Sequence, residues 1–315
     1  MVSVKIKKIK GKRYLYAEYS FRVDGKIKKI SKLIKNKEDA RRKEVSAYFR
    51  EKELDAYKKL AIARYKKDDV LDERKIVKIE SYRVEYKEIL RKLTKKQISD
   101  VLDRFTVNFT YESNAIEGNS LTLKDVTLFL SENMMPKGKD LREIYETRNT
   151  RIANALLFRG KIKISLKDIV KIHAVLMKDT GVSLSFKKMP NFLLMRNVET
   201  TPPEMVYVEM KRLVEWYNSA KGKMHPLKIA AIFHGKFEKI HPFEDGNGRV
   251  GRVLANAILI DNNYPPLIIR KTSRQAYFSA LESFDGGHAP KLERFLVEKF
   301  EQTFEKFFKV YVKYL

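Results

Sequence analysis

The sequence predicts a mainly α-helical protein in two parts, a small N-terminal three-stranded sheet with one helix and a larger helical unit. Residues 2–34 alternate apolar and polar side chains, as half-buried strands do. From about residue 78 onward, apolar side chains recur instead at three- and four-residue spacing, which is typical of helices. A charged break at residues 66–69 separates the two patterns, so we expect domains at 1–70 and 78–315.

The N-terminal domain is expected to begin with three strands joined by tight turns. Alternation runs through residues 2–34, and Asp24-Gly25 is a favoured hairpin turn between the second and third strands. Asn36 then stands where a helix cap is expected, with Asp39 three residues later. A long, charged helix should begin there.

The larger domain is expected to be almost wholly helical. Gly118 is a common residue at a helix C-terminus, and Thr122 with Asp125 forms the pattern that caps the next helix. Residues 181–203 are irregular and β-prone. Helices are expected at about 100–118, 140–158, 165–178, 204–218, 226–240, 272–284 and 290–315.

Composition excludes several classes of protein. The 315 residues contain no cysteine, which excludes a disulfide framework and a thiolate zinc site. No apolar stretch is long enough to span a bilayer, and the N-terminus lacks the apolar core of a signal peptide. We therefore expect a cytoplasmic protein with no membrane partner. His173 and His234 each lie among apolar neighbours in expected helices, so both should be packed structural residues.

Residues 241–252, with the sequence H-P-F-E-D-G-N-G-R-V-G-R, concentrate the chemically active side chains. His241 titrates near neutrality, and Asp245 is a carboxylate suited to a metal ion. The apolar run that follows has helical spacing, so the Gly-Asn-Gly turn opens a helix whose free N–H groups attract anions. Arg249 and Arg252 project from the same face of its first turn. The segment predicts a polyphosphate site with a base beside it.

This segment resembles the signature of the Fic family (the Fic/Doc superfamily), H-P-F-x-D/E-G-N-G-R-x-x-R, and it matches every specified position. The resemblance covers roughly residues 80–285 and implies a helical core with a β-hairpin flap over its active site. Members of the family typically transfer AMP from ATP to a Ser, Thr or Tyr hydroxyl of a protein and release pyrophosphate. The toxin branch that phosphorylates its targets has Lys at position 248, so Gly248 favours the adenylyl-transferring branch.

What the resemblance implies for single residues agrees with their chemistry. His241 would accept the proton of the target hydroxyl, which is a poor nucleophile at neutral pH. Asp245 would hold Mg²⁺, a cation that prefers one or two carboxylates together with phosphate oxygens. The ATP phosphates would be bound by the turn and the first helical turn, through Asp245 with its metal and through Gly246, Asn247, Gly248, Arg249 and Arg252.

A second motif lies more than a hundred residues upstream. Ser113 is followed four residues later by Glu117 and then by Gly118, which resembles the inhibitory motif of regulated Fic proteins. In those proteins the glutamate pairs with the second arginine of the signature, here Arg252, and obstructs placement of the ATP γ-phosphate. The resemblance therefore implies autoinhibition by an N-terminal helix at about 100–118; taken alone, the motif would be an ordinary helix end.

A segment after the signature resembles the part of the family fold that closes over the nucleoside. Tyr277 and Phe278 would pack on the ribose and adenine, and Asp285 stands where a polar adenine contact usually falls. Family members often have Tyr at 278 and Asn at 285, so this chain departs from the pattern at both positions. Aromatic residues at helical spacing also suit a core, which is the alternative.

The β-hairpin flap implied by the resemblance should lie within residues 191–201. In the family it pairs with the target segment by strand addition, through main-chain hydrogen bonds. Val198 and Glu199 are the expected target contacts. This loop is short and lacks the glycines often found there, and a plain connecting loop is the alternative.

The charge distribution indicates a second partner. Residues 1–50 contain 17 Lys/Arg and 5 Asp/Glu, a net charge of +12 within a formal total of +26. An aromatic three-stranded sheet and helix with so many cations loosely resembles the arm-type DNA-binding domains of tyrosine recombinases. Residues 1–70 would then bind nucleic acid through phosphate attraction, and a solvated basic face is the alternative.

The resemblance as a whole predicts a protein adenylyltransferase with Mg²⁺ as cofactor and ATP as substrate. Its partner would be a protein with a hydroxyl side chain, which includes the chain itself. A homodimer that controls the inhibitory helix is a further possibility. Two alternatives keep the same residues. In the first, Glu117 positions a water and the site removes AMP from a modified protein. In the second, the protein is a DNA-bound regulator that uses the core only to sense nucleotide.

Overall fold

The computed structural model describes residues 2–191 and 198–312. It divides into two compact units, Met1–Glu85 and Tyr86–Leu315, with the division inside helix α2 (Glu73–Lys92). The architecture confirms the predicted fold class, a mainly α-helical protein with a small three-stranded sheet near its N-terminus. Among the described residues, no helix is long and apolar enough to cross a lipid bilayer.

The first unit is an antiparallel sheet packed on one face against helix α1 (Lys43–Arg64). Its strands lie in chain order: β1 (Val2–Ile9), β2 (Lys12–Val23) and β3 (Lys26–Ile34). Alternate residues of β2 are buried, and the ring of Tyr19 lies 5.5 Å from that of Phe49 on α1. The alternating pattern revealed these strands because only one face of the sheet is covered.

The helix after the sheet begins later than predicted. Asn36 and Asp39 form the expected reciprocal cap: the Asp39 N–H donates to Asn36 Oδ1 at 3.0 Å, and the Asn36 N–H donates to Asp39 Oδ2 at 3.1 Å. They cap only a 3₁₀ turn, Glu38–Arg41, and Arg42 is extended with φ −67° and ψ 147°. Arg42 Nε pairs with Asp39 Oδ1 at 2.8 Å, which stabilises this bend, so α1 starts at Lys43.

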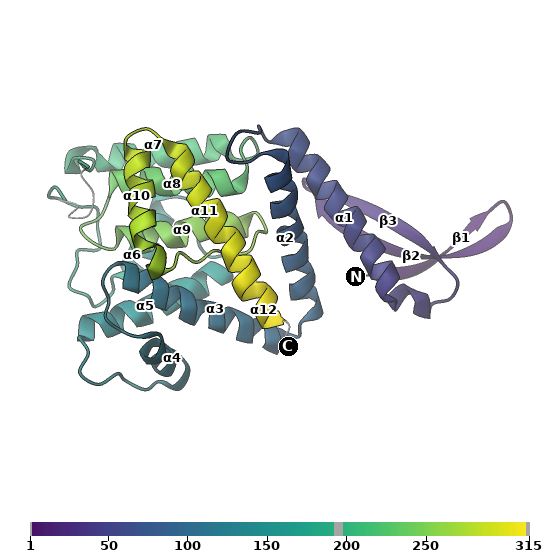
Figure 1. Ribbon diagram of the computed structural model, residues 1–315, viewed down its shortest axis with the longest axis horizontal. Helices are drawn as coiled ribbons and strands as arrows, with labels where there is room; N and C mark the ends of the chain where they lie inside the picture. The colour runs from purple at the N-terminus through teal and green to yellow at the C-terminus, as the bar shows by residue number, and fades with distance from the viewer. Residues whose placement is uncertain (1, 192–197, 313–315) are drawn as a thin grey trace. The chain divides into compact units, whose positions relative to one another are not determined.

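The second unit is a bundle of helices around α9, whose residues are almost all buried. Helix α9 packs against α3, α5, α6 and α8, and α8 in turn packs against α7, α10 and α11 (Figure 1). A π-helical turn, Phe304–Phe308, divides the C-terminal helix predicted at 290–315. The bounds are α3 (Lys95–Ile116), α4 (Leu123–Glu132), α5 (Leu141–Phe158), α6 (Leu166–Leu176), α7 (Pro203–Ala220), α8 (Pro226–Ile240), α9 (Asn247–Asp261), α10 (Arg274–Asp285), α11 (Ala289–Thr303) and α12 (Lys309–Val312).

Helix ends in this unit follow the predicted caps, with one exception. Thr122 and Asp125 form the expected capping box at the start of α4, where the Asp125 N–H donates to Thr122 Oγ1 at 3.1 Å. Helix α3 ends before Gly118, whose φ of +102° favours glycine. The exception is the start of α3, which lies before residue 100 because Thr94 and Gln97 form a capping box of their own.

Candidate active site

The predicted signature spans the end of α8, a tight loop and the start of α9. Helix α8 ends at Ile240, and its C-cap residue His241 takes a left-handed conformation (φ 51°, ψ 61°) where the chain leaves the helix. Two residues on, the Phe243 side chain is fully buried and stacks on the His173 ring, with centroids 3.7 Å apart. Phe243 therefore anchors the loop in the core.

Asn247 and Gly246 set the shape of the loop. The Asn247 amide bonds both main-chain groups of Phe243: the Phe243 N–H donates to Oδ1 at 2.9 Å, and Nδ2 donates to the carbonyl at 2.8 Å. Gly246 has φ +84°, and a Cβ there would press into the Met177 sulfur. These contacts hold the loop in one conformation and so determine where α9 begins.

His173, on α6, supports the same loop. Its Nε2 lies 3.0 Å from the Asp245 carbonyl, and because a carbonyl only accepts, Nε2 carries the ring proton. Burial lowers the pKa of His173 to about 4, so the ring is neutral at physiological pH. The residue is packed, as predicted, and it also orients the main chain at Asp245, which the sequence did not indicate.

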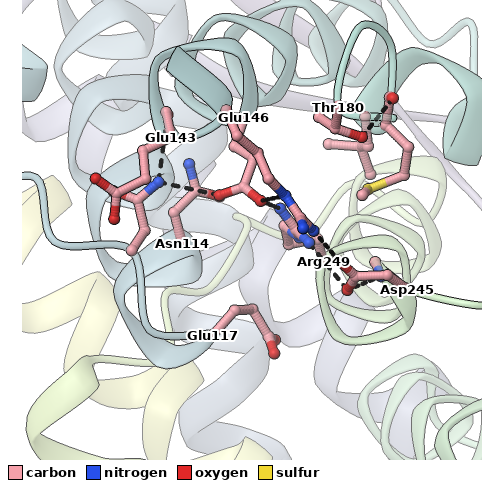
Figure 2. Close-up of polar contacts among 12 residues, drawn as sticks. Asn114, Glu117, Glu143, Glu146, Thr180, Asp245 and Arg249 are labelled. Carbon is pink, nitrogen blue, oxygen red and sulfur yellow. Dashed lines mark hydrogen bonds and ion pairs between the residues drawn. The ribbon is translucent and has the colours of Figure 1, made fainter. Parts of the chain in front are cut away.

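Asp245 and Arg249 belong to a closed set of four charged side chains, which we call the ion-pair ring. Figure 2 shows Arg249 between the carboxylates of Glu146 and Asp245. Arg249 Nη1 lies 2.8 Å from Glu146 Oε1, and Arg249 Nη2 lies 3.2 Å from Asp245 Oδ1. Arg142 closes the ring by pairing with Asp245 and, at 3.3 Å, with Glu146. The ring balances two positive with two negative charges, so the almost fully buried Arg249 is neutralised.

Asp245 is the predicted metal-binding carboxylate. Although burial raises its pKa, attraction from Arg249, the Gly246 N–H and Arg142 outweighs burial and holds the pKa below its ordinary value. The side chain is 41% exposed. An ionised and accessible carboxylate fits Mg²⁺, which takes its remaining ligands from water and phosphate. Since no group of three or more metal-ligating side chains lies together in the described part of the chain, such a site would rest on Asp245.

Arg252 faces the end of helix α3. Its Nε donates to Ser113 Oγ and its Nη2 donates to the Ser113 carbonyl, both at 2.9 Å. Nη2 also lies 2.6 Å from Glu117 Oε1, so the ion pair expected between Glu117 and Arg252 is present. The Arg252 side chain is 3% exposed and that of Glu117 is 32% exposed. The pair is therefore buried on the arginine side and open to solvent on the glutamate side.

The Glu117 carboxylate lies over the first turn of α9. A Cβ built on Gly248 would collide with Glu117 Oε1 and would come within 2.9 Å of Arg252 Nη1. Glycine at this position therefore makes room for a carboxylate from another helix. Because the N-terminus of a helix attracts anions, Glu117 occupies a place that also suits a phosphate.

The sequence and the fold of the second unit are both similar to those of known proteins. The Fic/DOC family model matches residues 163–259. The protein adenylyltransferases Fic of Drosophila willistoni and Nematostella vectensis are 32% and 30% identical to this chain over 200 and 202 residues. Each alignment covers 62% of this chain, and they cover 40% and 47% of the two relatives. Residues 163–259 of this chain therefore match the Fic/DOC family.

Solved structures of Fic proteins have a similar fold. A crystal structure of a Fic domain-containing signaling protein from Bacteroides thetaiotaomicron matches with a TM-score of 0.67 and 24% identity, over 75% of this chain and 96% of that one. Fic-1 from C. elegans matches with a TM-score of 0.67 and 24% identity, over 75% of this chain and 72% of that one. The chain spans less than half the length of the curated relatives it matches.

The end of α3 is held by contacts beyond the ion pair with the signature. Arg274 Nε donates to the Ile116 carbonyl at 2.7 Å, at the last turn of the helix. Past the helix end, Asn119 Nδ2 donates to Glu146 Oε2 at 3.1 Å. The segment that carries Glu117 is thus anchored both to the start of α10 and to the ion-pair ring.

The predicted nucleoside residues lie on α10 and differ in exposure. Tyr277 is 1% exposed, its hydroxyl lies 2.7 Å from His234 Nε2, and burial raises its pKa. It takes the core position that helical spacing also allowed. Phe278 is half-buried, with the Arg274 guanidinium 4.9 Å from its ring centre, and Asp285 is the half-buried last residue of the helix. Of the two aromatic side chains, Phe278 is the one with surface open to a ligand.

The predicted flap falls largely outside the described residues, which omit 192–197. Val198 is half-buried and Glu199 is exposed, and neither belongs to a strand. The start of the segment is tied to the signature loop, since Asn191 Nδ2 donates to the carbonyls of Phe243 and Glu244 at 3.1 and 3.0 Å. The segment therefore begins beside the active site.

No sequence pattern identified three side chains as part of the site: Arg142, Glu146 and His173. Arg142 and Glu146 are one turn apart on α5, where the sequence pattern is that of an ordinary surface ion pair. Their role arises because α5 packs against α9, which no local pattern reveals.

Proposed function

We propose that this chain transfers AMP from ATP to a Ser, Thr or Tyr hydroxyl of a protein, with release of pyrophosphate, and that Glu117 restrains the reaction. One observation carries the proposal: the Glu117 carboxylate lies over Gly248 at the N-terminus of α9 and pairs with Arg252 at 2.6 Å. An anion bound at a cationic helix start marks a place for phosphate. The similarity to proteins named protein adenylyltransferase Fic supports the same chemistry.

His241 is suited to accept the proton of the target hydroxyl. Its Nδ1 lies 3.3 Å from the Glu238 carbonyl, so in the neutral ring Nδ1 carries the proton and Nε2 has the lone pair. The hydroxyl oxygen bonds to the α-phosphorus of ATP while the bond from that phosphorus to the bridging oxygen breaks. Pyrophosphate leaves with the bond electrons, and His241 Nε2 takes the hydroxyl proton.

Phosphate charge is balanced at the start of α9. The main-chain N–H groups of Asn247 and Gly248 belong to the first turn of α9, and Arg249 places a guanidinium there that Glu146 and Asp245 already partner. Because Glu146 holds Arg249 in place, that charge is oriented before the substrate binds and needs little reorganisation. Phe278 and Asp285 on α10 contact the nucleoside.

Asp245 would hold Mg²⁺, which would neutralise phosphate charge and position the nucleotide. Arg142 pairs with the same carboxylate and is 46% exposed, so it can turn toward solvent when Asp245 takes a cation. Arg249 stays with Glu146, since both side chains are almost fully buried.

Autoinhibition follows from competition for Arg252. A carboxylate and the ATP γ-phosphate cannot share one guanidinium without one of them losing its partner. While Glu117 keeps its place, ATP binds in a pose that misaligns the α-phosphorus for attack. Release needs only a movement of the partly exposed Glu117 side chain, because the arginine is already in position.

The target is a protein with a hydroxyl side chain, and the chain itself qualifies. Residues 191–201 present it, with Val198 and Glu199 pairing with the main chain of the target by strand addition. A homodimer contact that shifts the end of α3 would control Glu117.

A second candidate function is removal of AMP from a modified protein. The observation that favours it is the position of the Glu117 carboxylate, which lies within the site and is 32% exposed, so it can orient a water. In this reaction water replaces the protein hydroxyl at phosphorus, and Glu117 is required for activity instead of restraining it.

Label transfer from α-labelled ATP separates these functions. Wild type, Glu117→Gly and His241→Ala are incubated with Mg-ATP and candidate targets, and intact masses are measured. AMP transfer predicts labelling by Glu117→Gly and a loss of about 10²–10⁴-fold in His241→Ala, the usual contribution of a general base. Loss of AMP stripping in Glu117→Gly would favour removal. If all three proteins bind nucleotide but none transfers AMP, the result would favour a role in sensing nucleotide.

A further inference from the structure

The sheet of the first unit ends in a two-stranded extension, which we call the basic ribbon (residues 7–14). Strands β1 and β2 remain paired up to the turn at Lys10 and Gly11, whereas pairing of β2 with β3 stops at Leu15. The ribbon therefore projects beyond the end of β3, as Figure 1 shows. Lys10 and Gly11 have φ of 50° and 80°, which is the two-residue turn that matches the twist of a hairpin.

Five of the eight ribbon residues are cations, and none is acidic. Lys7 pairs with Glu18 at 2.9 Å. The other four are exposed and form no ion pair with any described residue: Lys8, Lys10, Lys12 and Arg13. Lys8 and Arg13 are directly opposite each other across the strands, an arrangement that is unfavourable for like charges. A ribbon that holds repelling cations together is stabilised by an anionic partner.

We propose that the basic ribbon binds duplex DNA by entering its major groove. A two-stranded β-ribbon fits that groove, which is about 12 Å wide. Successive side chains point to opposite faces of a strand, so Lys8 and Arg13 project from one face of the ribbon and Lys12 from the other. Phosphates line both walls of a groove, so cations on both faces can reach them.

The shape of the ribbon favours DNA over other polyanions. Duplex RNA has a deep and narrow major groove that side chains cannot read. An anionic lipid surface would contact one face of the ribbon, where apolar side chains would need to gather. Ile6 and Ile9 are 62% and 45% exposed, but their odd spacing places them on opposite faces.

Binding of the full chain to a labelled DNA duplex, followed by fluorescence anisotropy without ATP, tests the proposal independently of AMP transfer. Four phosphate contacts give a slope of about −3.6 in log affinity against log salt, so affinity should fall about 150-fold between about 50 and 200 mM NaCl. The variant Lys8→Gln/Lys10→Asn/Lys12→Gln should bind at least about tenfold more weakly and reduce the slope to about −1. Asn replaces Lys10 because it tolerates the left-handed backbone of the turn.

A matched control, Lys43→Gln/Lys59→Gln/Lys66→Gln, removes the same number of charges from exposed sites elsewhere in the first unit. It should keep the wild-type affinity within about twofold, and both variants should melt at the wild-type temperature, since surface changes rarely alter stability. Equal weakening of both variants would reduce the effect to general charge attraction and overturn the proposal. Competition by duplex RNA or phosphatidylserine vesicles as strong as that by DNA, or no binding at low salt, would also overturn it.

Discussion

The two arginines of the signature are equally buried, each about 3% exposed, but their carboxylate partners differ. Arg249 pairs with Glu146, which lies in the second turn of α5, is 10% exposed and also accepts hydrogen bonds from Arg142 and Asn119. Arg252 pairs with Glu117, which caps the end of α3 and is 32% exposed.

This difference indicates that the first pair belongs to the scaffold and the second is replaceable. Moving Glu146 would require unpacking a helix and would leave a buried guanidinium without its partner. Moving Glu117 requires only rotation of a partly exposed side chain, and an incoming phosphate can then neutralise Arg252. The same chemical pair therefore serves two purposes because it is set at two different places in a helix.

The largest effect should come from breaking the scaffold pair. Glu146→Gln leaves Arg249 buried without its main carboxylate, so we expect a loss of about 3–5 kcal/mol in the free energy of unfolding. The identical change at the other site, Glu117→Gln, should cost less, because Glu117 is partly exposed and the buried Arg252 keeps its hydrogen bonds to the Ser113 hydroxyl and carbonyl. Urea unfolding of both variants measures the contrast, and similar losses would remove the distinction between scaffold and replaceable pairs.

The scaffold side of the comparison can also be tested through His173, which supports the signature loop and should make folding stability depend on pH. Its folded-state pKa is about 4 and its ordinary value is 6.5, so the stability it contributes is complete above pH 6.5 and is lost as pH falls toward 4. The loss should reach about 3 kcal/mol, from about 1.36 kcal/mol per pKa unit. His173→Gln keeps a donor for the Asp245 carbonyl without a titrating ring. Unfolding measured at pH 7 and pH 4 should therefore change less in this variant than in wild type, and parallel losses would contradict this account.

A substitution at Gly248 tests the replaceable pair, Glu117 with Arg252. Alanine there must push the Glu117 carboxylate aside, so Gly248→Ala should destabilise the wild type by about 1 kcal/mol. In the Glu117→Ala background the collision with the carboxylate is gone and only the 2.9 Å approach to Arg252 Nη1 remains, so alanine should destabilise the protein less than it does in wild type. A double-mutant cycle on unfolding free energies gives the coupling, and additive effects would mean that Glu117 does not lie over position 248.

The smallest effect is expected at the exposed edge of the ion-pair ring. Arg142 and Asp245 are 46% and 41% exposed, so Arg142→Ala should change stability by less than about 1 kcal/mol. Because Asp245 loses a competing cation, half-maximal AMP transfer should need less Mg²⁺ than in wild type. A titration of activity against Mg²⁺ checks this, and an unchanged or raised requirement would show that Arg142 does not compete with the metal.

The parts of the site that were predictable belong to contiguous sequence motifs, the signature at 241–252 and the upstream motif at 113–118. His241, Asp245 and Arg249 could be found because the signature is contiguous, and alternation revealed the strands because one face of the sheet is covered. Glu146 and His173 could not, since their roles depend on α5 and α6 packing against the signature segment from far away in the chain, 72 residues in the case of His173 and Asp245. The bend before α1 was missed for a related reason, because it depends on a single ion pair between Asp39 and Arg42.

The central claim is that Glu117 and the γ-phosphate of ATP compete for Arg252. The most direct test is the intact mass of wild type and Glu117→Gly after incubation under identical Mg-ATP conditions, with Glu117→Gly/His241→Ala as the inactive control. The account predicts a gain of one adenylyl group, formed at least about tenfold faster in Glu117→Gly than in wild type, which corresponds to removing a competitor worth about 1.4 kcal/mol. The control should gain no mass. Equal labelling of wild type and Glu117→Gly would contradict the account.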